Sequence, residues 1–265
     1  MKQRVISAAV FIAIMLSCVL ICAETRILFF IAASLLACRE MKNALAKLDL
    51  NVVAWPLYAM CTVCSVLIFL GKAGYAFPAF LVLMVALFAQ MILGGKITVK
   101  DVLATLAVCA YPLSPLMLIV YISSHELIWA AVLLNAILPA IISDTFALFG
   151  GKRFGKHKLA PHISPKKTVE GLICGIIMGT VSGFGVYGIL IAFDKNVIPL
   201  WAILIGSLLA ALSGALGDLA ASSVKREAGI KDYSNLIPGH GGMLDRVDSA
   251  LFAIPVVYML YALFV

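Results

Sequence analysis

Charged side chains are scarce in this sequence. They make up 12% of the 265 residues, whereas hydrophobic residues make up 63%. Soluble domains typically carry about 25% charged residues and about 45–50% apolar ones. A soluble core of this size could not hide so much apolar surface, so the composition excludes an ordinary water-soluble fold as well as a disordered chain. The natural solvent of this chain is lipid.

Recognisable cysteine chemistry is also missing. Cys61 and Cys64 form a C-x-x-C pair, but it lies inside a long apolar run with no histidine or further cysteine pair nearby. We therefore expect small buried hydrophobic residues and neither a disulfide framework nor a zinc site. All seven cysteines lie in or beside apolar runs: Cys18, Cys22, Cys38, Cys61, Cys64, Cys109 and Cys174.

Long apolar runs fill most of the chain. A membrane-spanning helix needs about 20 mostly apolar residues, and backbone exposed to lipid must satisfy its own hydrogen bonds. The expected fold class is therefore all-α, a polytopic integral membrane protein with about nine transmembrane helices. The predicted spans are residues 5–23, 27–46, 52–70, 75–93, 102–122, 127–149, 171–193, 198–221 and 246–265. The second is the weakest, because Arg39, Glu40 and Lys42 interrupt it, and its far end is expected to project into the cytoplasm.

Basic residues are distributed unevenly between the two sides of these spans. With a cytoplasmic N-terminus, 17 of the 20 Lys and Arg residues fall in inside segments, and only Arg26, Lys72 and Lys195 fall outside. Cytoplasmic loops of membrane proteins carry such an excess, so we expect the N-terminus in the cytoplasm and the C-terminus outside. The net charge of +7 indicates these loops and anionic lipid, and no nucleic-acid partner is expected.

The distribution of charge also suggests a division of labour. We expect residues 1–125 to form N-terminal transmembrane helices that act as a scaffold and offer dimer contacts. Residues 126–265 would form the catalytic transmembrane helices, with cytoplasmic loops at 150–170 and 222–246. The outer connections are short, so any chemistry is expected on the cytoplasmic side.

Two carboxylates, Asp144 and Asp218, lie near the inner ends of apolar spans. Charges within the hydrocarbon are costly and usually face a cavity or a partner. For Asp144 a second explanation stays open, namely a carboxylate without a function that is hydrated at the membrane interface. Asp218 follows Gly214 and Gly217, which would let another helix approach closely. Such packing is compatible with a function for the carboxylate.

The segment 222–248 is the most informative part of the sequence. Asp245 and Asp248 are three residues apart at the start of the last helix, so their Cβ atoms lie about 5–6 Å apart on one face. Mg²⁺ typically uses one or two carboxylates plus substrate phosphates, and two metal ions can clamp an in-line phosphoryl displacement. Residues 238–242, Pro-Gly-His-Gly-Gly, would either cradle phosphate with backbone N–H groups or form a plain interfacial turn. His240 would orient a substrate or stabilise charge.

Basic residues flank these acids. Lys225, Arg226 and Lys231 would bind phosphate, with the arginine offering a bidentate fork, or would serve only as cytoplasmic anchors. The basic loop 150–170 lacks the spacing of a P-loop. It would bind a polyanion at the membrane surface, or merely anionic lipid headgroups.

Taken together, these motifs resemble the signature of the phosphatidate cytidylyltransferases, also called CDP-diacylglycerol synthases. That pattern runs Ser-x-x-Lys-Arg, four residues, Lys-Asp-x-Ser, then Pro-x-His-Gly-Gly-x-x-Asp-Arg-x-Asp. The residues that fit it here are Ser222, Lys225, Arg226, Lys231, Asp232, Ser234, Pro238, His240, Gly241, Gly242, Asp245, Arg246 and Asp248. Asp144-Thr145 and the stretch 155–171 also look like the family, so the detailed resemblance covers residues 140–250.

The resemblance implies transfer of CMP from CTP to phosphatidate, giving CDP-diacylglycerol and pyrophosphate in phospholipid biosynthesis, with two Mg²⁺ ions. The phosphatidate phosphate would attack the α-phosphorus of CTP, at the cytoplasmic face of the inner (plasma) membrane, in a homodimer. The implied catalytic residues are Asp218, Asp245, Asp248 and His240. The implied metal ligands are Asp144, Asp218, Asp245 and Asp248. The implied phosphate-binding residues are Ser222, Lys225, Arg226, Lys231, Asp232, Gly241, Gly242, Arg246, Lys166 and Lys167.

Two other functions stay open on the sequence alone. A transporter of an anionic solute would use buried acids to couple cations, but the polar residues cluster on one membrane face. Another membrane phosphotransferase, one that moves a phospho-group from CDP-diacylglycerol to an alcohol, would resemble Asp-Gly-x-x-Ala-Arg followed by paired acids. That motif is absent from this sequence.

Overall fold

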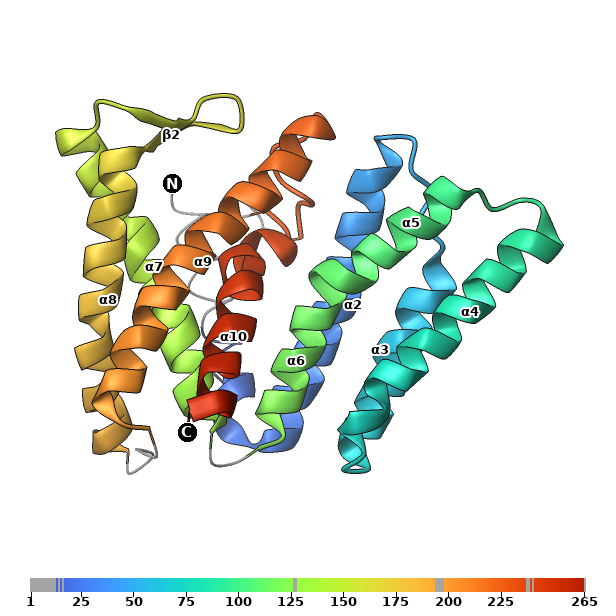
Figure 1. Ribbon diagram of the computed structural model, residues 1–265, viewed down its shortest axis with the longest axis horizontal. Helices are drawn as coiled ribbons and strands as arrows, with labels where there is room; N and C mark the ends of the chain where they lie inside the picture. The colour runs from blue at the N-terminus through green and yellow to red at the C-terminus, as the bar shows by residue number, and fades with distance from the viewer. Residues whose placement is uncertain are drawn as a thin grey trace. The chain divides into compact units, whose positions relative to one another are not determined.

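The chain is a helical, polytopic membrane protein (Figure 1). The computed structural model describes residues 13, 15, 17–125, 128–193, 198–236, 239 and 241–264. Within these ranges six helical segments are long and apolar enough to cross a membrane: Ala73–Gly94, Val99–Ser123, Trp129–Phe154, Val169–Ala192, Leu200–Glu227 and Leu244–Phe264. The helix α3 (Ala54–Phe69) is apolar but shorter. The expected class is confirmed, whereas the total of nine spans stays a prediction, because most of the span 5–23 lies outside the described residues.

One predicted span, 102–122, is assembled from three pieces. The helix α5 (Val99–Val108) leads into the π-helical turn η2 (Cys109–Leu113), and α6 (Ser114–Ser123) follows. Pro112 lies within the turn, where a residue without a backbone N–H interrupts the regular helical hydrogen bonds. The start of α5 is fixed by a capping box, because the side chains of Thr98 and Asp101 each accept a hydrogen bond from the other residue's backbone N–H.

The contacts among these elements divide the chain into two compact units, which are described separately. Unit 1 comprises Met1–Ser124 and Glu227–Arg246, and unit 2 comprises His125–Arg226 and Val247–Val265. The segment 227–246, which carries much of the family signature, thus belongs to the same unit as the N-terminal helices. The functional division into a scaffold (1–125) and a catalytic part (126–265) stays a prediction.

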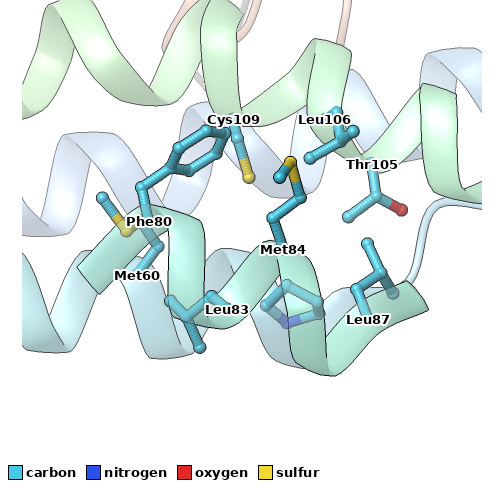
Figure 2. Close-up of a pocket in the computed structure, with 9 residues that line it drawn as sticks. Met60, Phe80, Leu83, Met84, Leu87, Thr105, Leu106 and Cys109 are labelled. Atoms are coloured by element: carbon cyan, nitrogen blue, oxygen red, sulfur yellow. The ribbon is translucent and has the colours of Figure 1, made fainter. Parts of the chain in front are cut away.

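Unit 1 is built around α2 (Ala23–Ala46), which packs against α6 and α3, while α3 packs against α4 (Ala76–Gly94). The short 3₁₀ turn η1 (Ala73–Tyr75) precedes α4. A small apolar pocket lies between α3, α4 and the adjoining parts of α5 and η2, and its lining includes Met60, Leu83 and Leu106 (Figure 2). Its lining contains no charged side chain, and the hydroxyl of Thr105 is already used by Val53 N and Asp101 O. This pocket is therefore unsuited to a nucleotide.

Unit 2 contains α7 (Trp129–Phe154), α8 (Val169–Ala192), α9 (Leu200–Glu227) and α10 (Leu244–Phe264), of which α9 ends and α10 begins in unit 1. The helices α7 and α8 lie side by side along most of their length (Figure 1). Their close approach depends on a stripe of buried glycines on α8. A Cβ atom added at Gly175 would lie 2.6 Å from the backbone oxygen of Ser143. The stripe comprises Gly171, Gly175, Gly179 and Gly183, of which Gly183 lies against Leu204 and Ser207 of α9.

A buried polar junction joins three helices of unit 2. Asn135 of α7 is fully buried and accepts a hydrogen bond from Ser207 Oγ of α9 at 2.6 Å. The Asn135 amide donates to Ile203 O at 3.1 Å and lies 2.5 Å from Tyr261 Oη of α10. Because polar groups in an apolar interior need partners, this junction favours one relative register of α7, α9 and α10.

The basic loop expected at 150–170 is more ordered than the sequence suggests. The helix α7 continues to Phe154, and an antiparallel hairpin of β1 (Lys158–Ala160) and β2 (Ser164–Thr168) follows. Pro161 and Pro165 disfavour a helix in this stretch. The Glu170 carboxylate closes the base of the hairpin, because it accepts hydrogen bonds from the backbone N–H groups of residues 156 and 157.

Candidate functional site

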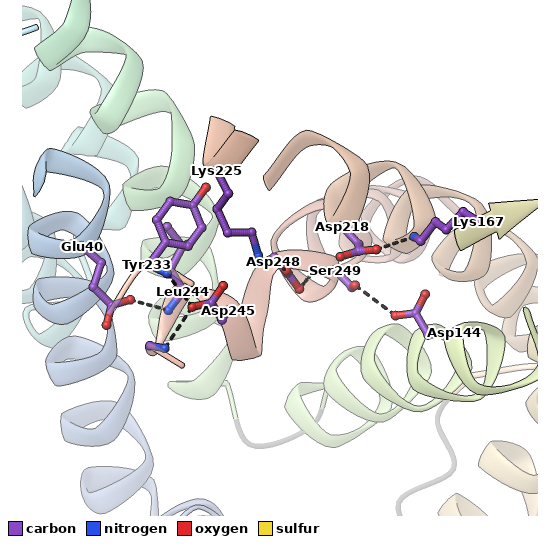
Figure 3. A network of polar contacts seen from close by, with 11 residues as sticks. Glu40, Asp144, Lys167, Asp218, Lys225, Tyr233, Leu244, Asp245, Asp248 and Ser249 are labelled. Atoms are coloured by element: carbon purple, nitrogen blue, oxygen red, sulfur yellow. Dashed lines mark hydrogen bonds and ion pairs between the residues drawn. The ribbon is translucent and has the colours of Figure 1, made fainter. Parts of the chain in front are cut away.

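Three acids of unit 2 come from three different helices. The Asp144 carboxylate of α7 accepts a hydrogen bond from Ser249 Oγ at 3.4 Å. Asp218 of α9 forms an ion pair with Lys167 of β2. Lys225 Nζ, at the end of α9, lies 4.0 Å from Asp248 Oδ2 of α10. Figure 3 shows these pairs, which place two lysines beside acids of the apolar helices α9 and α10.

The charges of these acids act on one another. Asp248 lies close enough to Asp218 and Asp144 for their carboxylates to repel electrostatically, and Lys167 and Lys225 supply opposing charge. Asp248 and Lys225 are only 9% and 8% exposed. Removing charged groups from water costs free energy unless the groups are paired and hydrogen-bonded, so burying this cluster in an otherwise apolar unit lowers the stability of the fold. Buried charges that destabilise the fold are typical of functional sites.

Small residues on α9 bring the acids together. A Cβ atom added at Gly217 would lie 2.6 Å from the backbone oxygen of Asp248, and one added at Gly214 would lie 2.9 Å from the Cβ of Ala140. The close helix approach expected from these glycines is therefore present. It allows Asp218, the next residue on α9, to lie near the start of α10.

The predicted phosphate-binding residues of unit 2 lie at or near this cluster. Ser222, Lys225 and Arg226 are on the last turns of α9, and Arg226 Nε donates to Ile163 O of the hairpin at 3.4 Å. Lys167 reaches Asp218, whereas its neighbour Lys166 is exposed. Successive side chains of a strand point to opposite faces, so when Lys167 of β2 points toward Asp218, Lys166 points away from it.

The signature residues of unit 1 form a separate arrangement around Asp245. Asp245 Oδ2 accepts hydrogen bonds from the backbone N–H groups of Tyr233 at 2.8 Å and Gly242 at 2.9 Å. Gly241 has a φ of +82°, and a Cβ atom there would lie 2.8 Å from the same oxygen. The loop thus closes on a carboxylate of its own segment. Lys231, Asp232 and Arg246 are exposed.

The phosphate roles predicted for the glycine-rich loop stay predictions. The N–H of Gly242 donates to Asp245 in this structure. Pro238 and His240 lie outside the described residues, so the predicted role of His240 also stays a prediction.

Sequence reasoning missed the role of Glu40, which it treated only as an interruption of the second span. The Glu40 carboxylate of α2 accepts hydrogen bonds from Ser234 Oγ at 2.6 Å and Met243 N at 3.0 Å. It also accepts one from Leu244 N at 2.7 Å, which Figure 3 shows. Its partners lie about 200 positions away in the sequence, so no local pattern could reveal it. The one available signal was a carboxylate in an otherwise apolar helix.

Magnesium would be held by only some of the predicted ligands. Within the described part of the chain, no group of three or more His, Cys, Asp or Glu side chains is arranged to hold a metal ion by itself. Mg²⁺ usually binds one or two carboxylates and completes its shell with substrate phosphates and water. Asp144, Asp218 and Asp248 offer oxygen ligands of this kind beside lysines suited to phosphate, so the donor set fits the ion.

The fold and the polar clusters define an integral membrane protein in which acids and lysines are gathered between apolar helices. The chain belongs to the cytidylyltransferase family, whose model matches residues 2–264. The family predicted from the signature is therefore confirmed.

Curated relatives with similar sequences carry the name phosphatidate cytidylyltransferase. The one from Bacillus subtilis is 45% identical over 122 residues, which cover 46% of this chain and 44% of the relative. The one from Staphylococcus aureus is 42% identical over 128 residues, and the one from Staphylococcus saprophyticus is 41% identical over 128 residues; each match covers 48% of both chains. The chain spans about half the length of the curated relatives it matches.

Proposed function

We propose that the protein is a phosphatidate cytidylyltransferase, a nucleotidyltransferase that makes CDP-diacylglycerol and pyrophosphate from CTP and phosphatidate. The observation that carries this proposal is the polar cluster of unit 2, where acids of α7, α9 and α10 lie beside Lys167 and Lys225. Family membership and the names of the relatives support the reaction. One substrate is a lipid and the other a soluble polyanion, which suits a charged site between membrane helices.

The proposed reaction forms one phosphorus–oxygen bond and breaks another. An oxygen of the phosphatidate phosphate attacks the α-phosphorus of CTP, the bond between the α- and β-phosphates breaks, and pyrophosphate leaves. The nucleophile is already ionised at neutral pH, so no general base is needed. The protein would therefore contribute mainly positioning and electrostatic stabilisation.

The basic residues of unit 2 supply the positive side of this arrangement. Lys167 and Lys225 would hold phosphate groups and stabilise the leaving pyrophosphate, while Arg226 would add a planar fork at the end of α9. Bound Mg²⁺ would neutralise further phosphate charge, held by one or two of Asp144, Asp218 and Asp248 together with substrate phosphates and water. Asp245 is retained as a further predicted ligand.

The finer topology belongs to the same proposal. The uneven distribution of Lys and Arg supports nine spans with the N-terminus in the cytoplasm and the C-terminus outside. The site would then face the cytoplasm, where CTP is found, from the inner membrane of a bacterium. A homodimer is proposed from the family resemblance.

The deciding experiment uses purified protein in mixed micelles of detergent and phosphatidate with Mg²⁺. CTP labelled at the α-phosphate should transfer its label to a chloroform-soluble product, whereas label at the γ-phosphate should leave as pyrophosphate. EDTA should abolish the transfer. Failure of a folded, phosphatidate-binding protein to label lipid would refute the proposal, and transport of an anionic solute into sealed vesicles would be measured next.

Variants assign the roles within the cluster. Asp218→Asn and Asp248→Asn should each lower turnover by about 10²–10³-fold, the usual loss for one electrostatic group in a transition-state site. The matched control is Asp49→Asn, the same change at an exposed acid in a turn. A folded Asp218→Asn enzyme with full turnover would overturn the role given to Asp218.

A further inference from the structure

Glu40 is the least expected acid of unit 1. It is 5% exposed and lies on α2, in the weakest of the predicted spans. Both of its oxygens are used, because Oε1 accepts from Ser234 Oγ and Met243 N, and Oε2 accepts from Leu244 N. A carboxylate buried to this degree, with these three hydrogen bonds directed at one distant segment, has a specific partner.

That partner is the start of α10. The first N–H groups of a helix have no partner within the helix, and they carry the positive end of its dipole. Glu40 satisfies two of these groups, those of Met243 and Leu244, from another helix. Asp245 satisfies the N–H of Gly242 from within the segment. The anion at this helix N-terminus is therefore supplied by the protein itself.

The described parts of the segment 228–243 form no helix or strand, so its shape depends on such bonds. Glu40 holds one side of the segment through Ser234, whose hydroxyl also accepts from Leu236 N at 3.2 Å. Asp245 holds the other side through Tyr233 N. Two carboxylates thus fix a loop that carries the Lys-Asp-x-Ser and Gly-Gly parts of the family signature.

The space around Gly242 supports the same view. A Cβ atom added at Gly242 would lie 2.6 Å from Glu40 Oε2 and would also collide with Oε1. The φ of Gly242 is not among the positive values of this chain, so the backbone alone would accept another residue. A glycine is needed at position 242 because the Glu40 carboxylate occupies the side-chain position.

We propose that Glu40 is a positioning residue for CMP transfer, one that fixes the described parts of the segment 228–243 and the first turn of α10. The inference rests on the proposed function for its kinetic consequence, and on the hydrogen bonds alone for its structural one. Glu40 is not a catalytic residue, since its oxygens are turned toward the protein's own donors.

Glu40→Gln is the most informative variant. Each oxygen of Glu40 accepts from a backbone N–H, so either orientation of a glutamine amide would set its NH₂ group against an N–H donor. We expect kcat to fall about 10- to 100-fold, the scale of loss for a small misplacement of reacting groups. The KM for phosphatidate should stay close to the wild-type value, and the melting temperature in detergent should fall by only a few degrees, the scale expected for the loss of one or two buried hydrogen bonds.

Two related variants separate positioning from simple support of the fold. Glu40→Asp keeps the charge on a shorter side chain and should recover part of kcat at the same melting temperature. The matched control, Glu24→Gln, makes the same change at an exposed acid of the same helix and should have no effect. If Glu40→Gln lowered the melting temperature and left kcat unchanged, Glu40 would only support the fold, and the proposal would be overturned.

A double-variant cycle tests the contact itself. Gly242→Ala should lower kcat as much as Glu40→Gln, because the new methyl group must displace the carboxylate. In a Glu40→Ala background the same Gly242→Ala change should cost little more, since the collision is gone. Gly94→Ala, where nothing lies within 4 Å of an added Cβ, is the control. Additive losses in the cycle would contradict the contact.

Hydrogen exchange distinguishes failure of this inference from failure of the proposed function. In Glu40→Gln the amides of Met243 and Leu244 should exchange faster with solvent than in the wild type, whatever reaction the protein performs. Faster exchange with no lipid labelling by the wild type would refute the proposed function and retain Glu40 as the residue that holds the loop. Unchanged exchange would overturn the inference even in an active enzyme.

Discussion

The polar junction at Asn135 gives a prediction whose size follows from the structure. Replacing Asn135 with leucine keeps a similar volume but removes the hydrogen bonds to Ser207, Tyr261 and the Ile203 carbonyl. Ser207 is fully buried and Tyr261 is 4% exposed, so both hydroxyls would lose their partner away from water.

The expected cost can be estimated in two ways. Hydrogen bonds between membrane helices contribute on average about 0.6 kcal/mol each, so three of them contribute about 2 kcal/mol. Counting instead two orphaned neutral hydroxyls at about 1 kcal/mol or more each gives a similar sum. For a protein of this size that change corresponds to a fall of about 4–8 °C in melting temperature.

The assay is thermal unfolding of purified variants in one detergent. Tyr261→Phe and Ser207→Ala should each give part of the Asn135→Leu loss, because each removes one member of the junction. Thr180→Val is the matched control, since the Thr180 hydroxyl donates to Ile176 O of its own helix and to no other helix among the described residues. If Asn135→Leu melts at the same temperature as Thr180→Val, the junction does not hold the three helices together.

Three further predictions concern other contacts. Gly175→Ala should lower the melting temperature, because its methyl group would collide with a backbone oxygen of α7. Gly185→Ala should not lower it, because no atom lies within 4 Å of a Cβ added there. Equal melting temperatures would refute the close packing. Lys167→Met should lower turnover in the lipid-labelling assay. Adding Asp218→Asn should lower turnover little further, because the two residues act as a pair. Fully additive losses of turnover would show that they act separately. Arg26→Met should lower the free energy of unfolding in denaturant titrations by about 1.5–3 kcal/mol, because the Arg26 guanidinium donates to Ser123 O at the end of α6. A loss no larger than that of an exposed lysine variant would contradict this role.

Much of the fold could be predicted because lipid imposes simple rules on sequence. Spans of about 20 apolar residues must be helical, and the observed helices lie where such runs occur, from α3 at Ala54 to α10 at Leu244. The glycines before Asp218 also predicted a close helix contact, since a missing side chain has a local consequence. These features depend on composition and short spacing, which the sequence displays directly.

The candidate site was less accessible to sequence reasoning because its contacts are long-range. Lys167 was predicted as one of several basic residues, yet only the fold shows that it reaches Asp218, about 50 positions further on. Asp245 was predicted from its spacing to Asp248, but the hydrogen bonds from Tyr233 and Gly242 depend on how the preceding loop folds back. Charge and spacing indicated which residues matter, and the partners had to come from the structure.

The charges of α2 illustrate why the weakest predicted span is nevertheless a well-defined helix. Arg26, near its start, donates to Ser123 O at the C-terminal end of α6, where the helix dipole is negative. Glu40, near its end, accepts from the N–H groups at the start of α10, where the dipole is positive. The two residues are 14 positions apart, about 21 Å along a helix. Each charge therefore meets a helix end of opposite sign, and Glu40, one of the residues that make α2 a poor hydrophobic span, is also the residue that connects α2 to the start of α10.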